Sequence, residues 1–210
     1  MEKGRIIAIE GIMSSGKTTH VQSLRDYLED RGYVVTTIGI QSSKLMADAI
    51  ASVKRDIVFQ RRTLFLAYVT DLADQTENLV KPSLDSGFIV IADGYVLTLE
   101  AWALTRRLER EWVEGGLSML PKASLSISLI SPPTEIMRRI IKRKGFLDPL
   151  SESVDLNVKE DTFLAYKKYV KEFQSHLKSI SPNVLVTKNN VNEVNREIER
   201  LVREELKIDA

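Results

Sequence analysis

The segment with the clearest chemical meaning is Gly11–Thr18, which reads GIMSSGKT and fits the pattern G-x-x-x-x-G-K-[ST] without a mismatch. The two glycines let the backbone turn tightly and approach phosphate groups closely, while loop amides point at the anion. Lys17 supplies a positive charge for the β- and γ-phosphates, and the Thr18 hydroxyl is placed to bind Mg²⁺. We expect the whole loop and the next residue to contact the nucleotide: Gly11, Ile12, Met13, Ser14, Ser15, Gly16, Lys17, Thr18 and Thr19.

The residues around this loop supply the context that the motif needs. Residues 5–9 form an apolar run typical of a strand that is buried on both faces. After the loop, Val21, Leu24 and Leu28 recur at helical spacing, and Gly32 stands where a helix would stop. The order strand, loop, helix favours a phosphate-binding loop over a glycine-rich turn that contains Lys-Thr by chance.

A carboxylate follows the apolar run FIVIA at residues 88–92, which predicts a second buried strand. Asp93 then stands at the carboxyl end of that strand, the usual place for an aspartate that holds Mg²⁺ or its waters. The alternative is an aspartate that caps the next helix or forms a turn with Gly94. We favour the metal role, with Thr18 and Asp93 as the two metal-binding residues.

Candidate acceptor-site residues follow the predicted strand at residues 33–38 and lie on a predicted helix over residues 59–84. Gln41, in the loop GIQSS at residues 39–43, either lines a pocket or belongs to an ordinary connector. Tyr68 and Asp71 lie three residues apart on one helix face and suit a nucleobase and a sugar hydroxyl. The alternative is a core tyrosine beside a surface aspartate.

A basic helix end follows the predicted helix start at Ser131-Pro132-Pro133, and the helix is expected over residues 134–144. Arg139 and Arg143 lie four residues apart and face the same way. Because a planar guanidinium matches phosphate oxygens, we expect a lid at about residues 138–158 that brings these arginines to the phosphates. Favourable placement of cations at a helix C-terminus is the other interpretation.

The remaining elements complete an alternation of strands and helices. We expect helices over residues 44–53, 96–113, 159–177 and 191–206, strands over 125–130 and 184–186, and a turn at Gly115-Gly116. Three arginines of the 96–113 helix, Arg106, Arg107 and Arg110, are expected on a solvated face.

The composition narrows the class of protein. A chain of 210 residues with 43% hydrophobic residues suits one α/β domain over residues 1–210. The net charge of +1 predicts no nucleic-acid partner, and the absence of cysteine excludes disulfides and cysteine-bearing zinc sites. No apolar run approaches the roughly 18 residues of a membrane span, so we expect no membrane association and a cytoplasmic location.

Over nearly the whole chain, the order and spacing of motifs resemble the thymidylate kinase family, in particular its archaeal branch. The resemblance rests on Glu10-Gly11, Asp71, the segments KPSLDSGFIVIADGY and SPPTEIMRRIIKRK, the QSS after the second strand, and the final strand, loop and helix. It implies a P-loop NTPase-type three-layer fold, with a central five-stranded parallel sheet flanked by helices and a lid.

The resemblance also implies phosphoryl transfer from ATP with Mg²⁺ to dTMP, which gives dTDP. By position, Lys17, Arg139 and Arg143 would stabilise the transferred group, with Asp93 as the fourth catalytic residue. The expected substrate contacts are Gln41, Tyr68 as the ring that stacks on thymine, Asp71 and Tyr95. The loop at residues 187–190 would border the adenine, and members of the family are usually homodimers.

The chain departs from the family pattern in several places. Gly94 replaces the arginine of Asp-Arg-Tyr, which grips the acceptor phosphate, and Met13 replaces a charged residue. Leu72 and Ala103 replace an arginine and an amide that contact the base. Two alternatives therefore stay open: a kinase with a different nucleotide acceptor, and a non-catalytic paralogue that binds ATP.

Overall fold

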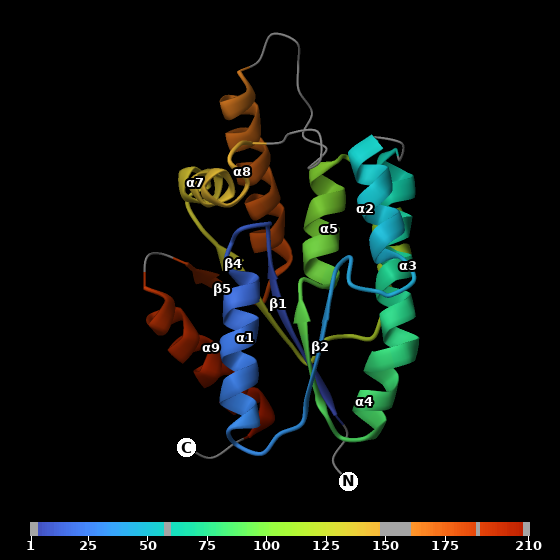
Figure 1. The fold of residues 1–210 in the computed structure, drawn as a ribbon, viewed down its shortest axis with the longest axis vertical. Coiled ribbons are helices and arrows are strands. Elements are labelled where there is room, and N and C mark those ends of the chain that lie inside the picture. Colours follow the sequence, from blue (N-terminus) through green and yellow to red (C-terminus); the bar gives the residue numbers. More distant parts are fainter. Residues whose placement is uncertain (1–3, 57–59, 148–160, 188–189, 208–210) are drawn as a thin grey trace.

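One parallel five-stranded sheet lies at the centre of the computed structural model, which describes residues 4–56, 60–147, 161–187 and 190–207 (Figure 1). The strand order is β2-β3-β1-β4-β5. The strands are β1 (Arg5–Gly11), β2 (Val35–Gly39), β3 (Ile89–Asp93), β4 (Leu125–Ile130) and β5 (Asn183–Val186). Helices lie on both sides of the sheet, which confirms the expected α/β fold class.

The helices are α1 (Lys17–Glu29), α2 (Ala47–Asp56), α3 (Arg61–Gln75), the π-helical segment η1 (Thr76–Val80), α4 (Lys81–Asp85), α5 (Val96–Thr105), α6 (Arg110–Leu117), α7 (Pro133–Lys144), α8 (Thr162–Ile180) and α9 (Val191–Leu206). Helices α1 and α9 cover one face of the sheet, and α3 and α5 pack against the other. Helix α8 packs along α5 and α7.

The first strand shows why its sequence has no polar alternation. Ile7 and Ile9 point into the core shared with α1 and α9, whereas Ile6 and Ala8 point into the core shared with α3 and α5. Because successive side chains of a strand face opposite sides, a central strand covered on both sides must be apolar throughout.

The parallel register brings three loops to one edge of the sheet. Asp93 at the end of β3 is paired with Ile9 of β1 and with Gly39 of β2. The phosphate loop leaves β1 two residues after Ile9, so the ends of β1, β2 and β3 lie together. This edge carries the candidate site, as expected for ligands of open α/β sheets.

The prediction of one continuous helix over residues 96–113 is wrong. This segment is divided into α5 and α6 by a break in which Arg107 has a positive φ of 61°. Gly115 and Gly116, expected as a turn, lie inside α6. A Cβ on Gly116 would lie 3.1 Å from the ring of Phe65 in α3, so close packing between the two helices explains a glycine there.

Two further expectations need correction. The helix expected over residues 59–84 is divided into α3, η1 and α4, and Pro82 stands near the start of α4. Arg106, expected on a solvated face, is only 3% exposed. Residues 148–158 of the expected lid lie outside the described residues, and its first part belongs to α7, which ends at Gly145 with a positive φ of 86°.

Candidate nucleotide-binding site

The phosphate loop occupies the turn between β1 and α1. Gly16 precedes α1 with a φ of 105°, a conformation that glycine adopts without strain. The ammonium group of Lys17 folds back over the loop and donates to the carbonyl oxygens of Gly11 at 2.9 Å and Ile12 at 3.1 Å. The hydroxyls of Ser14 and Ser15 are buried and make no hydrogen bond within the described part of the chain. A loop of amides with one lysine and unpartnered hydroxyls fits the phosphates of a nucleotide.

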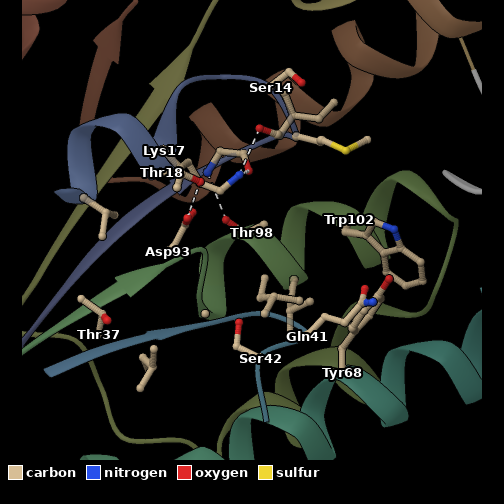
Figure 2. Close-up of a pocket in the computed structure, with 18 of the residues that line it drawn as sticks. Ser14, Lys17, Thr18, Thr37, Gln41, Ser42, Tyr68, Asp93, Thr98 and Trp102 are labelled. Atoms are coloured by element: carbon tan, nitrogen blue, oxygen red, sulfur yellow. Dashed lines mark hydrogen bonds between the residues drawn. The ribbon is translucent and has the colours of Figure 1, made fainter. Parts of the chain in front are cut away.

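Thr18 and Asp93 meet at the same edge. The Thr18 hydroxyl donates to a carboxylate oxygen of Asp93 over 2.5 Å, and Figure 2 shows this contact below the loop. A hydroxyl and a carboxylate are oxygen ligands of the kind that Mg²⁺ takes when phosphates and waters complete its shell. The Thr18–Asp93 pair therefore fits a metal that arrives with phosphates. Among the described residues, no group of three or more His, Cys, Asp or Glu is placed to hold a metal ion.

Glu10 fixes the loop to α5, a role that sequence reasoning missed. Its fully buried carboxylate accepts hydrogen bonds from the backbone N–H groups of Tyr95, Leu97 and Thr98 and from the Thr98 hydroxyl. The Thr98 Oγ1 in turn accepts from the amide of Gly11 at 3.0 Å. A glutamate inside an apolar strand was the available signal, since a buried charge needs partners.

A cavity of about 580 Å³ opens beside the loop. Figure 2 shows Lys17, Thr18 and Asp93 at one end, with Tyr68 and Trp102 at the other. Ten of the expected site residues line it: Gly11, Ile12, Met13, Ser14, Lys17, Thr18, Gln41, Tyr68, Asp93 and Arg143. The cavity therefore has a polar end suited to phosphates and an aromatic end suited to a flat ring.

Asp71 and Tyr95 are not among the residues that line this cavity. The buried Asp71 carboxylate accepts from the backbone N–H groups of Gln41 at 2.7 Å, Ser42 at 3.3 Å and Ser43 at 2.9 Å. The hydroxyl of the buried Tyr95 donates to the carbonyl oxygen of Pro121. In this structure Asp71 holds the loop that carries Gln41, and Tyr95 packs in the core.

Gly94 adopts a φ of +78°, and a Cβ there would lie 3.1 Å from Ile40 and 3.5 Å from the Lys17 side chain. A larger side chain would therefore adopt a disfavoured backbone conformation and crowd the loop. Arg25 and Arg143 line the same cavity as Lys17, so cations are present on other elements.

A second cavity of about 310 Å³ lies on the other side of the loop. Ser15, Gly16, Thr19, Arg139 and Thr187 are among its lining residues. Arg139 donates from Nε to Glu135 at 2.8 Å, and its Nη1 lies 3.4 Å from the carbonyl oxygen of Ser15. The expected residues thus divide between two cavities that share the phosphate loop.

A glycine loop between β1 and α1, an aspartate at the end of β3 and cavities on both sides of the loop define a nucleotide-binding protein of the P-loop class. The thymidylate kinase family model matches residues 9–198, and the chain belongs to the thymidylate kinase family.

The similar curated proteins agree with this assignment. A protein of Saccharolobus solfataricus named probable thymidylate kinase 2 is 30% identical over 191 residues, which cover 90% of this chain and 89% of the relative. A probable thymidylate kinase of Pyrococcus horikoshii is 30% identical over 75% of this chain and 79% of its own length. Another probable thymidylate kinase, of Thermococcus gammatolerans, is 26% identical over 97% of this chain and 98% of its own length. In the described part of the chain, no helix has the length and apolar character that crossing a membrane requires.

Proposed function

We propose that this protein transfers the γ-phosphoryl group of ATP to dTMP and so forms dTDP. The observation that carries the proposal is the position of the phosphate loop and the Thr18–Asp93 pair between two cavities. One cavity is available to each nucleotide, with the reacting phosphates at the loop between them. The names of the relatives support dTMP as the acceptor.

On the donor side, the second cavity accepts the base of ATP beside Thr187. Lys17 leaves its two carbonyl partners to bind the β- and γ-phosphates, and the N–H groups at the start of α1 bind the same anion. Thr18 and Asp93 hold Mg²⁺, directly or through its waters. Mg²⁺ neutralises charge on the transferred group when it is bound.

Arg139 and Arg143 stabilise the charge that develops during transfer. Arg139 already lies against the loop, and Arg143, one helical turn further along α7, lines the acceptor cavity. A guanidinium is planar, so the ion pair between its Nε atom and Glu135 fixes the direction in which the other N–H groups of Arg139 point. This arrangement provides cations on both sides of the transferred group.

On the acceptor side, Tyr68 stacks on the base and Gln41 lines the sugar end. Asp71 and Tyr95 act indirectly, since both are buried away from the cavity. Arg143 or Arg25 takes the acceptor phosphate in place of a side chain at position 94. With the phosphate bound by an arginine of another element, the acceptor site does not need a side chain at Gly94, which has a positive φ.

The chain is one nucleoside monophosphate kinase-like domain over residues 1–210 with a lid at about 138–158, and it acts in the cytoplasm. We also propose a homodimer that forms near α3, which presents the 48%-exposed Leu66. Sedimentation equilibrium of wild type and Leu66→Asp tests the dimer: a monomeric variant supports it, and a monomeric wild type contradicts it.

The function is tested by the release of ADP from ATP and Mg²⁺ with each nucleoside monophosphate in turn. We expect dTMP to give the highest kcat/KM. Higher turnover of another monophosphate would replace dTMP as the acceptor, and no turnover with intact ATP binding would leave an ATP-binding protein without kinase activity.

A further inference from the structure

Arg106 is an unusual residue, because it is an arginine buried to 3% exposure without a carboxylate partner among the described residues. Its Nε and Nη2 atoms are buried and make no hydrogen bond to any residue that the structure describes. Buried donors are normally satisfied, and a guanidinium stays charged because it does not lose its proton in proteins. The neighbouring arginines show the ordinary pattern, since Arg107 pairs with Glu172 and Arg110 with Glu100.

The surroundings of Arg106 connect it to the acceptor cavity. Its guanidinium carbon lies 4.9 Å from the ring centre of Trp102 and 4.6 Å from that of Tyr169. Both rings line the cavity, and Trp102 also forms an edge contact of 5.6 Å with Tyr68. The guanidinium thus lies directly behind two walls of the aromatic end.

Arg106 lies at the far end of α5 from the phosphate loop, at the aromatic end of the cavity. Helix α5 begins beside the loop, where the hydroxyl of Thr98 contacts the amide of Gly11. Arg106 follows Thr98 by eight residues, which corresponds to about 12 Å along a helix. Figure 1 shows α5 starting near the end of β3 and running away from the sheet. An acceptor whose phosphate lies at the phosphate-loop end of the cavity therefore places its base, and not its phosphate, near Arg106.

We infer that Arg106 recognises a carbonyl oxygen of the nucleobase at the aromatic end of the cavity. This inference rests on the proposed function and names the residue that selects an oxo-pyrimidine. Thymine carries an acceptor oxygen where cytosine carries an amino donor. The unpartnered N–H groups of Arg106 match the oxygen and oppose the amino group. Since Arg106 is not itself a lining residue, one of the two rings shifts when the base enters.

The test uses Arg106→Met, which keeps much of the length and packing of the side chain but removes its donors. We expect a rise of about 10- to 100-fold in KM for dTMP, the range for loss of hydrogen bonds from a charged group. The KM for ATP should stay within twofold. The preference for dTMP over dCMP should fall by a similar factor, which a merely structural role would not produce. Arg107→Met, on the same turn with an exposed side chain, is the matched control and should change neither value.

Trp102 supplies a second readout that does not need activity. The chain has two tryptophans, so Trp112→Phe leaves Trp102 as the only reporter. In that background dTMP should change the fluorescence, and Arg106→Met should weaken the fitted Kd by the same factor as KM. If Arg106→Met does not fold, Arg106→Leu, which also lacks donors, is compared in its place, with the same KM and preference changes expected.

Different experimental results would contradict the role of Arg106 and the proposed kinase function. An unchanged KM, Kd and dTMP preference in the Arg106 variant, with an active wild type, would overturn the inference alone. A wild type that binds dTMP in the fluorescence assay but never phosphorylates it would overturn the proposed function alone. Equal rises in KM for ATP and dTMP would show a structural role for Arg106 and would also overturn the inference.

Discussion

The hydroxyl of Thr18 donates to the carboxylate of Asp93 at 2.5 Å, although 75 residues separate them in the chain. Thr18 stands on the first turn of α1 and Asp93 ends β3. Their contact follows from the parallel pairing of β1 with β3, which aligns the carboxyl ends of the two strands. The proposed metal site therefore depends on the sheet as much as on the phosphate loop.

Replacement of Asp93 tests this pair. Asp93→Asn keeps the shape of the side chain but removes the negative charge, so we expect the Mg²⁺ concentration for half-maximal activity to rise by about 10- to 100-fold. A Mg²⁺ titration of kcat at saturating ATP measures the change. The exposed Asp85→Asn on α4 is the control. An unaltered titration for Asp93→Asn would remove this residue from the metal site.

Two adjacent arginines of α7 form a matched pair. Arg139 lies against the phosphate loop, whereas Arg138, which also lines the second cavity, is exposed and, among the described residues, forms an ion pair with Glu135 alone. We expect Arg139→Ala to lower kcat by about 10²- to 10³-fold, the range for loss of one donor to developing charge. Arg138→Ala should lower kcat by less than about fivefold, since an exposed ion pair contributes little. Similar effects of the two changes would show that Arg139 has no special role.

Asp71 offers a test of indirect action. Asp71→Ala leaves the N–H groups of Gln41, Ser42 and Ser43 without their acceptor, so the loop should lose its fixed position. We expect KM for dTMP to rise by about tenfold, in line with the loss of hydrogen bonds to a charged group, with little change in KM for ATP. Thr70→Ala, an exposed neighbour on α3, serves as the control. Steady-state kinetics with each substrate varied in turn gives both constants, and equal values in wild type and Asp71→Ala would contradict the role.

The buried Glu10 should affect stability in a pH-dependent way. Burial raises the pKa of its carboxyl above the ordinary 4.5, although hydrogen bonds from Thr98 and Tyr95 oppose the rise. The folded protein then holds this proton more tightly than the unfolded chain. The free energy of unfolding therefore falls as pH rises from 4.5 to the pKa of the folded protein, because the buried carboxyl loses its proton over this range. Above that pKa, Glu10 causes no further change in the free energy of unfolding.

Urea unfolding of wild type and Glu10→Gln between pH 4.5 and 8 checks this sign. The wild type should lose stability relative to the variant as pH rises, because only the wild type carries the buried acid. A relative gain for the wild type over the same range would mean that the hydrogen bonds outweigh burial.

Local patterns were sufficient for much of the fold. The strand at residues 125–130 and the helix at residues 191–206 have the expected bounds, since both combine clear periodicity with clear ends. The break after α5 was not visible, because the residues before α6 carry no proline or glycine. Gly116 was misleading for the opposite reason: it is a glycine that serves the packing of Phe65 and not a turn.

The site was partly visible for a similar reason. A motif such as Gly11–Thr18 carries its own chemistry, and strand order then places Asp93 beside it. Glu10 and Asp71 differ, because their carboxylates are occupied by backbone N–H groups that distant segments provide. Arg106 differs too: helical periodicity cannot show that α8 covers it. Such partners depend on tertiary packing, which a single sequence does not display.

The most direct test of the central claim is the rate of ADP release from ATP and Mg²⁺ with and without dTMP, measured beside Lys17→Ala. Lysine is the only side-chain ammonium in the phosphate loop, so its loss should abolish the transfer. The account predicts strong dTMP-dependent release by the wild type that is lost in Lys17→Ala. ATP binding by the wild type without any dTMP-dependent release would contradict it.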